Sequence, residues 1–195
     1  MARFQASPRE SHLKVVKRIF RHLKVRPKLG LWYPLGGDFD LIAYTDSDYG
    51  ECNLNWKSTS GACQFLGNRL VSWQCKKQVS VAISTCEAEY VTTSSCCAHV
   101  LWIQHQLRDY GLNFLQTPIF IDNNSALLVA NNPVKFKNTK HIDVLHHFIR
   151  DCVEHGLIEM QRIDTEDNLA DLFTKAFDRA RFSDLVQHIG MRNHE

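Results

Sequence analysis

The chain has 195 residues, of which 44% are apolar and 23% are charged, a composition that suits one soluble domain with a small appendage. No apolar stretch approaches the roughly 18 residues of a membrane span, and the first ten residues lack the apolar core of a signal peptide, so we expect neither membrane insertion nor export. Seven cysteines without a C-x-x-C pair favour reduced thiols and argue against zinc.

The net charge of +2 conceals an uneven distribution along the chain. Residues 1–30 carry nine basic side chains and one acidic, whereas the remainder carries 14 basic and 20 acidic. A basic arm on an acidic body suits a protein that grips a polyanion with one part and binds cations with another. The alternative is that the basic side chains form an ordinary solvated helix face.

The first predicted element is a basic amphipathic helix that starts near Ser7. Ser7 can cap it, Pro8 fits the first turn and Glu10 closes a capping box. The apolar stripe of this helix must be buried on the following domain or on a neighbour, and it comprises Leu13, Val16, Phe20 and Leu23. Pro34 and the glycine pair 36–37 then mark a linker.

Strand and helix patterns alternate after the linker. Strand-like apolar runs around the Gly67-Asn68 turn indicate a three-stranded meander, and Gly111 and Gly156 mark the ends of two later helices. The predicted strands are 39–46, 60–67, 69–77, 118–122 and 157–164, and the predicted helices are 85–110, 124–132, 141–155 and 167–177.

Two of the predicted strands finish in aspartate, at Asp46 and Asp122. If these strands are neighbours in one sheet, their ends meet at the same edge. Two carboxylates brought together without a counter-ion repel, and one would be forced to protonate. Mg²⁺ removes the conflict, because hard cations prefer carboxylate oxygens as ligands.

Two predicted helices add further carboxylates. Glu87 lies three residues after Ser84, which is capping-box spacing and gives it a structural role. Glu89 lies about 200° round the helix from Glu87 and continues into a mostly apolar face, so Glu89 is favoured as the inward residue. Asp171 lies one turn inside the last predicted helix beside apolar residues, and a carboxylate there needs a partner.

The candidate site is therefore Asp46, Glu89, Asp122 and Asp171. Each residue alone has a structural interpretation, as a strand-end turn or a solvated helix position. Their shared placement, at the ends of two strands and the starts of two helices, favours a common site more strongly than any one of them does.

Seven motifs are spread along the chain: "YTDSDYG", "KSTSGACQFLG", "VSWQCKKQ", "STCEAEY", "IFIDNNSAL", "NTKHIDVLHHFIRD" and "NLADLFTK". Through these motifs the chain resembles a known family, the ribonuclease H region of copia-type LTR retrotransposon polyproteins. The resemblance covers nearly the whole chain, and the first segment resembles the end of the reverse transcriptase region. It implies an α/β ribonuclease H-like fold, a five-stranded mixed sheet flanked by helices. The implied divisions are a basic helical segment, 1–37, the ribonuclease H-like domain, 38–178, and a C-terminal helix or tail, 179–195.

The resemblance also implies a reaction and its site. The four acids match the Asp, Glu, Asp, Asp order of the family, which implies hydrolysis of the RNA strand of RNA–DNA hybrids with two Mg²⁺ ions, or Mn²⁺ as a substitute. Asp46, helped by Asp122, is expected to bridge both ions, Glu89 to hold the ion at the leaving group, and Asp171 the ion at the nucleophile.

Expected partners are the hybrid and the reverse transcriptase region of the same polyprotein. Polar loops after two strands supply candidate contacts to the 2′-hydroxyls of RNA, namely Asn123, Asn124, Ser125, Lys76, Lys77 and Gln78. The expected location is cytoplasmic, in a virus-like particle if the element is active, with a nuclear location as the alternative.

Two other functions compete with this interpretation. An integrase-like nuclease would place its glutamate after both aspartates, whereas Glu89 precedes Asp122. A degenerate or domesticated copy could bind nucleic acid or protein through the basic arm without catalysis.

One departure from many cellular ribonucleases H is the loop before Asp171. This loop contains no histidine, so Glu166 or water would have to take the place of that histidine.

Overall fold

The computed structural model describes residues 5–50, 56–124, 127 and 140–193. The chain divides into two compact units, which we describe separately. The arm unit holds the residues up to Trp32 and those from Met191 onward, and the sheet unit holds Tyr33–Gly190. The predicted domain boundaries after residues 37 and 178 stay predictions.

The arm unit consists of helix α1 (Glu10–Val25) and the antiparallel pair β1 (Leu29–Leu31) and β7 (Met191–Asn193). The prediction that Ser7 caps α1 and that Glu10 closes a capping box was wrong, because Glu10 is the first residue of the helix. The cap residue is Arg9, whose backbone N–H donates to His12 Nδ1 at 3.0 Å, so a side chain of the helix itself satisfies this N–H.

The predicted apolar stripe of α1 is largely exposed. Leu13, Phe20 and Leu23 each expose more than half of their surface.

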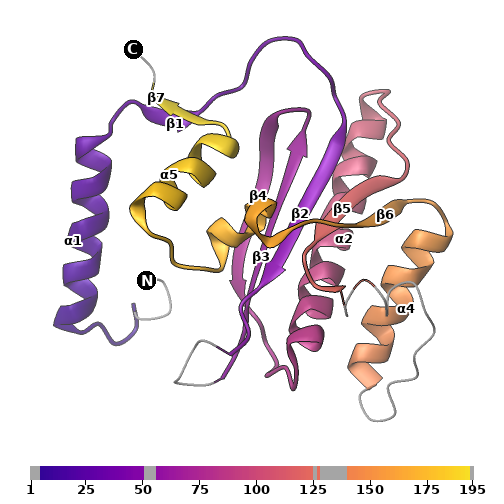
Figure 1. Cartoon of the computed structure of the whole chain (residues 1–195), viewed down its shortest axis with the longest axis horizontal. Helices are drawn as coiled ribbons and strands as arrows, with labels where there is room; N and C mark the ends of the chain where they lie inside the picture. The colour runs from indigo at the N-terminus through magenta and orange to yellow at the C-terminus, as the bar shows by residue number, and fades with distance from the viewer. Residues whose placement is uncertain (1–4, 51–55, 125–126, 128–139, 194–195) are drawn as a thin grey trace. The chain divides into compact units, whose positions relative to one another are not determined.

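The sheet unit is built on one five-stranded mixed sheet, which confirms the predicted architecture (Figure 1). Its strands lie in the order β4-β3-β2-β5-β6. The first three are antiparallel neighbours, whereas β5 pairs in parallel with both β2 and β6. The strands are β2 (Leu41–Ser47), β3 (Thr59–Leu66), β4 (Arg69–Lys77), β5 (Thr117–Ile121) and β6 (Ile158–Arg162).

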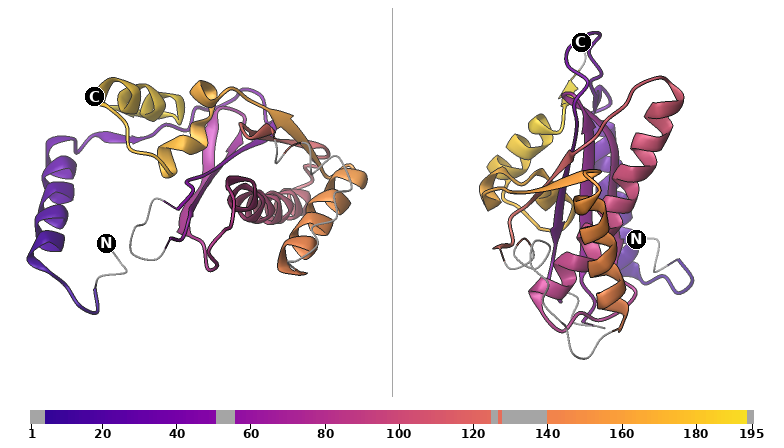
Figure 2. Two further views of the ribbon diagram at one scale, coloured as in Figure 1. Left: turned by 60° about the horizontal axis from the view of Figure 1, so that its bottom comes forward. Right: turned by 90° about the vertical axis from the view of Figure 1, so that its right-hand side faces the viewer.

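Helices cover both faces of this sheet (Figure 2). Helices α2 (Thr85–Asp109) and α4 (Lys140–Glu154) pack on one face, where the apolar core includes the fully buried Val100, Ile119 and Ile149. The 3₁₀ helix η3 (Leu169–Phe173) and helix α5 (Arg179–His188) lie on the other face. Within the described residues, no helix combines the length and the apolar character needed to cross a membrane.

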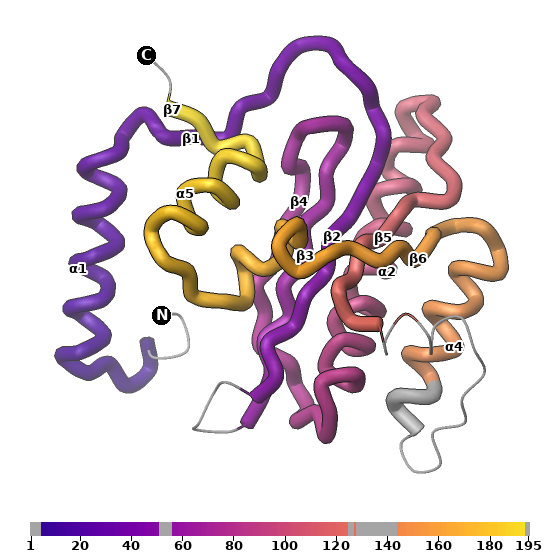
Figure 3. The backbone as a smooth tube through the Cα atoms, viewed as in Figure 1, coloured from indigo at the N-terminus to yellow at the C-terminus, as the bar shows by residue number. Residues whose placement is uncertain are grey.

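One predicted helix has a different form. It lies in the segment that joins β6 to α5 (Figure 3). In place of a single helix over 167–177, the chain forms only the 3₁₀ helix η3, which follows a first 3₁₀ turn, η2 (Thr165–Asp167), and the extended residue Asn168. Asn168 accepts a hydrogen bond from the backbone of Ala170, and this side-chain cap starts η3 afresh after the break. The helix predicted over 124–132 lies for the most part outside the described residues.

The lack of a side chain at Gly61 lets η3 lie directly on β3. A Cβ atom at this position would lie 2.6 Å from Thr174 Cγ2 and 3.0 Å from the carbonyl oxygen of Ala170. We therefore expect Gly61→Ala to lower the free energy of unfolding by about 1–3 kcal/mol, because the backbone of η3 must move to relieve the overlap. Urea denaturation measures this change, and an unchanged midpoint would show that η3 adjusts freely.

Candidate active site

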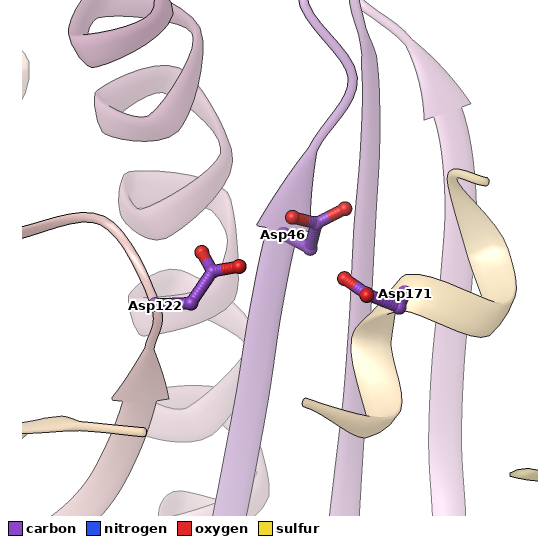
Figure 4. Close-up of side chains that lie close together, drawn as sticks. All are labelled: Asp46, Asp122 and Asp171. Carbon is purple, nitrogen blue, oxygen red and sulfur yellow. The ribbon is translucent and has the colours of Figure 1, made fainter. Parts of the chain in front are cut away.

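Three of the predicted acids come together at the end of the sheet where β2 and β5 finish (Figure 4). Each of Asp46, Asp122 and Asp171 offers a carboxylate oxygen, and these oxygens all lie within 4.8 Å of one another. The parallel pairing of β2 with β5 explains why two of them meet. Tyr44 of β2 pairs with Phe120 of β5, and each aspartate lies two residues after its member of this pair. The two aspartates therefore lie side by side at the carboxyl ends of neighbouring parallel strands.

Asp171 reaches the cluster because η3 is tied to β2. The side chain of Asn168 is fully buried. Its Nδ2 donates to the carbonyl oxygen of Thr45 at 3.1 Å, and its Oδ1 accepts from Ala170 N at 3.1 Å. The hydroxyl of Thr174, just after η3, donates to Asp46 Oδ2. These bonds hold η3 against the strand that carries Asp46.

Glu89 is buried beside the cluster, on the inward face of α2 as predicted. Its Oε1 accepts hydrogen bonds from Ser47 N at 3.0 Å and Ser47 Oγ at 2.9 Å. Its Oε2 is buried and has no hydrogen-bond partner among the described residues. Glu87 has the structural role predicted for it, since it accepts a hydrogen bond from Ile83 N at 2.8 Å and its own N–H donates to Ser84 Oγ.

Burial and mutual repulsion make these carboxyl groups weaker acids. Burial, and then the charge of Asp46, raise the pKa of Glu89 to about 8. Burial raises the pKa of Asp171 to about 6, although the hydrogen bond from Lys175 opposes the shift. The pKa of Asp122 is raised by burial and by Asp46. The site therefore carries less than its full negative charge at neutral pH, and a bound cation would favour the ionised forms.

The residues present fit divalent metal ions of the hard type. The donor set is entirely carboxylate, which is the ligand that Mg²⁺ and Mn²⁺ prefer. The unpartnered Oε2 of Glu89 adds a buried oxygen close enough to feel the charges of Asp46 and Asp122. A buried acceptor without a partner costs free energy, and a cation would satisfy it.

The raised pKa of Glu89 predicts how stability depends on pH in the absence of metal. The protonated form is favoured by the fold, so its stabilising effect is complete below the ordinary pKa of 4.5 and is lost as the pH rises through about 8. Glu89→Gln keeps a neutral side chain that can still accept from Ser47. In EDTA we expect this variant to match the wild type near pH 5 and to melt roughly 5 °C higher above pH 8. Thermal melts at the two pH values test this, and a pH-independent difference would contradict it.

The residues predicted to contact a substrate differ in their exposure to solvent. Lys76 and Asn124 are exposed, and Ser125 lies outside the described residues. Gln78 is buried, and its amide nitrogen donates to Ala88 O at 2.9 Å and to Ser60 Oγ at 3.1 Å, so it joins β4 to α2. Packing accounts for Gln78, whereas contact of these residues with a substrate stays a prediction.

The second aspartate of the "TDSD" motif does not belong to the cluster. Asp48 is buried, and its Oδ1 accepts a hydrogen bond from Thr59 N, while Asp48 N donates to Thr59 O at 3.1 Å. Asp48 therefore closes the ladder between β2 and β3, two residues beyond Asp46.

Sequence reasoning missed Lys175, whose Nζ lies 2.7 Å from Asp171 Oδ1 and 3.3 Å from Asp46 Oδ1. It also missed Asn168 and Thr174 as supports of the site. The spacing of Lys175 four residues after Asp171 is a recognisable ion-pair signal on a helical turn. The bonds of Asn168 and Thr174 to β2 join residues more than 120 positions apart, and no local pattern indicates them.

No protein-family model matches the chain. Among curated proteins, it is 34% identical over 192 residues to the retrovirus-related Pol polyprotein from transposon RE1 of Arabidopsis thaliana. It is 32% identical over 194 residues to that from transposon TNT 1-94 of Nicotiana tabacum. These matches cover 98% and 100% of the chain, which spans only 13% and 14% of the length of the two relatives.

Solved structures with a similar fold include several ribonucleases H. The LC11 ribonuclease H1 isolated from compost superposes with a TM-score of 0.51 at 17% identity, over 70% of this chain and 93% of that one. The N-terminal ribonuclease H domain of a Mycobacterium tuberculosis protein also gives 0.51, at 10% identity, over 76% of this chain and 98% of its own. A structure of the compost enzyme in complex with an RNA/DNA hybrid gives 0.50, at 14% identity, over 69% of this chain and 94% of its own. The chain thus has the ribonuclease H fold, and over its whole length it belongs to the family of one segment of the copia-type retrotransposon Pol polyproteins.

Proposed function

We propose that this chain hydrolyses the RNA strand of RNA–DNA hybrids with the help of divalent metal ions, two Mg²⁺ ions in the cell. The observation that carries the proposal is the gathering of three buried or half-buried carboxylates from β2, the end of β5 and η3 on a ribonuclease H fold. The similarity to Pol polyproteins supports it, because reverse transcription generates such hybrids.

The four acids have distinct places around the proposed ions. Asp46 lies between the other two aspartates of the cluster and is the residue best placed to serve both ions (Figure 4). Asp122 and Asp171 lie on opposite sides of Asp46 and would each hold an ion, and Glu89 from α2 would add a further oxygen. When bound, two such ions lower the pKa of an attacking water and stabilise the leaving oxygen. The chain supplies the orientation, through Asn168 and Ser47, and a largely buried setting in which charges interact strongly.

We further propose that the partners are the hybrid and the reverse transcriptase region of the same polyprotein, in the cytoplasm or a virus-like particle. The exposed stripe of α1, which includes Leu13, Phe20 and Leu23, is apolar surface that a neighbouring region would cover. The choice of RNA would depend on 2′-hydroxyl contacts from Asn123, Asn124, Lys76 and Lys77, with Ser125 and Gln78 as further candidates.

A cleavage assay with labelled substrates tests the proposed function. The purified chain is incubated with an RNA–DNA hybrid, the same RNA alone and the same duplex DNA, in Mg²⁺ and in EDTA. We expect cleavage of the RNA strand of the hybrid only, in Mg²⁺ only, with 5′-phosphate products. Binding of the hybrid without cleavage in either Mg²⁺ or Mn²⁺ would instead support a binding module that has lost catalysis.

A further inference from the structure

Lys175 places a positive charge inside the carboxylate cluster. Its Nζ lies 2.7 Å from Asp171 Oδ1 and 3.3 Å from Asp46 Oδ1, and only about a third of the side chain is exposed. The carboxylates that it pairs with expose 4% and 3% of their side chains. The backbone N–H of Lys175 also donates to the carbonyl oxygen of Asp171 at 2.9 Å, which fixes the start of the lysine on the same turn.

This ammonium occupies oxygens that a metal ion would need. Hard divalent ions bind carboxylate oxygens directly, and Lys175 holds one oxygen from each of Asp46 and Asp171. Two cations on the same oxygens repel strongly in a partly buried setting. The lysine has a flexible side chain with a four-carbon stem, and about a third of that side chain is exposed. The ammonium group can therefore withdraw into solvent while the aspartates stay in place.

We propose that Lys175 is a built-in counter-cation, which neutralises the cluster when no metal is bound and is displaced when a divalent ion enters. Lys175 then stabilises the metal-free fold at the expense of metal affinity, and it sets the concentration at which the site fills. The inference rests on the proposed function only in taking the cluster as the metal site, because it makes no claim about cleavage.

The test compares metal binding and stability in Lys175→Met and the wild type. In EDTA the variant is expected to melt at a lower temperature, since buried carboxylates lose their counter-charge. Its Kd for Mn²⁺, measured by calorimetry without nucleic acid, is expected to be about tenfold lower, which corresponds to about 1.4 kcal/mol. The rise in melting temperature on adding Mn²⁺ should be larger than in the wild type.

Two control variants separate competition from other effects. Lys175→Arg keeps a cation at the cluster and should bind Mn²⁺ as the wild type does. Lys14→Met removes one positive charge from α1, where Lys14 pairs with Glu10, and should leave the Kd unchanged. If Lys175→Met does not fold, Lys175→Gln takes its place in the same measurements.

An unchanged or weaker Kd in Lys175→Met would overturn the inference, because a lysine that merely positions η3 would lower affinity when removed. Absence of Mn²⁺ binding in both proteins would overturn it too. Tighter Mn²⁺ binding in the variant supports it whether or not the chain cleaves hybrids, so failure of the proposed reaction and failure of this inference give different results.

Discussion

Asp46→Asn is expected to slow cleavage of the hybrid at least roughly a thousandfold, equivalent to about 4 kcal/mol of transition-state stabilisation. Asp46 lies between the other two aspartates of the cluster, so in the proposed site its carboxylate would serve both ions (Figure 4). Asparagine has nearly the same shape and can still accept the hydrogen bond from Thr174. The loss should therefore fall on the rate, measured in single-turnover cleavage, whereas hybrid affinity in a filter-binding assay should persist or improve.

Asp48→Asn is the matched control for this variant. Asp48 is also buried at the end of β2, but its carboxylate accepts from Thr59 N and lies outside the cluster. Asparagine retains that acceptor, so cleavage should remain close to the wild-type rate. Equal rate losses in the two variants would show that charge at this strand end matters only for folding, and full activity of Asp46→Asn would reject the assigned site.

Asn168→Ala is expected to have the second-largest effect, although Asn168 holds no metal in the proposal. The substitution leaves the Thr45 carbonyl and the Ala170 N–H without the partner they have in the buried interior. We expect a loss of about 2–5 kcal/mol in the free energy of unfolding. Because Asp171 then loses its fixed distance from Asp46, cleavage by the folded protein should fall by about 10- to 100-fold.

A second helix cap provides the control for Asn168. Asp178 caps α5 by accepting a hydrogen bond from Arg181 N at 2.9 Å, and it is exposed. Asp178→Ala should cost about 1 kcal/mol and leave cleavage unchanged. Urea denaturation and cleavage below the unfolding transition measure both properties. A rate loss in Asn168→Ala that disappears once the unfolded fraction is corrected for would show that Asn168 acts on stability alone.

The strands and the acidic residues could be predicted because local patterns encode them. Apolar runs bounded by turns placed all five strands of the sheet, and Gly111 marked the end of α2, where it adopts a φ of 79°. Asp46 and Asp122 were recognisable because charge at the end of an apolar strand is unusual. Glu89 was separated from Glu87 by helical periodicity. The structure buries both residues, with Glu89 bonded to Ser47 of β2 and Glu87 to Ile83 just before α2.

The parts that could not be predicted depend on contacts between distant residues. Of the last predicted helix only the short η3 forms, because Asn168 bonds to β2 rather than continuing a helix, and helical periodicity does not reveal that bond. Strands β1 and β7 contain three residues each and pair across 160 to 164 positions, so neither has a recognisable pattern. The spacing of Lys175 from Asp171 is a local signal, but its contact with Asp46 depends on the sheet, which brings Asp46 beside Asp171.

A crystal structure of the chain grown with Mn²⁺, with the ions located by anomalous scattering, tests the central claim most directly. We predict Mn²⁺ bound by the carboxylates of Asp46, Asp122 and Asp171, with Glu89 turned toward an ion and Lys175 withdrawn from the cluster. Mn²⁺ found only at other surfaces, or Lys175 still paired with both aspartates at saturating Mn²⁺, would contradict the account.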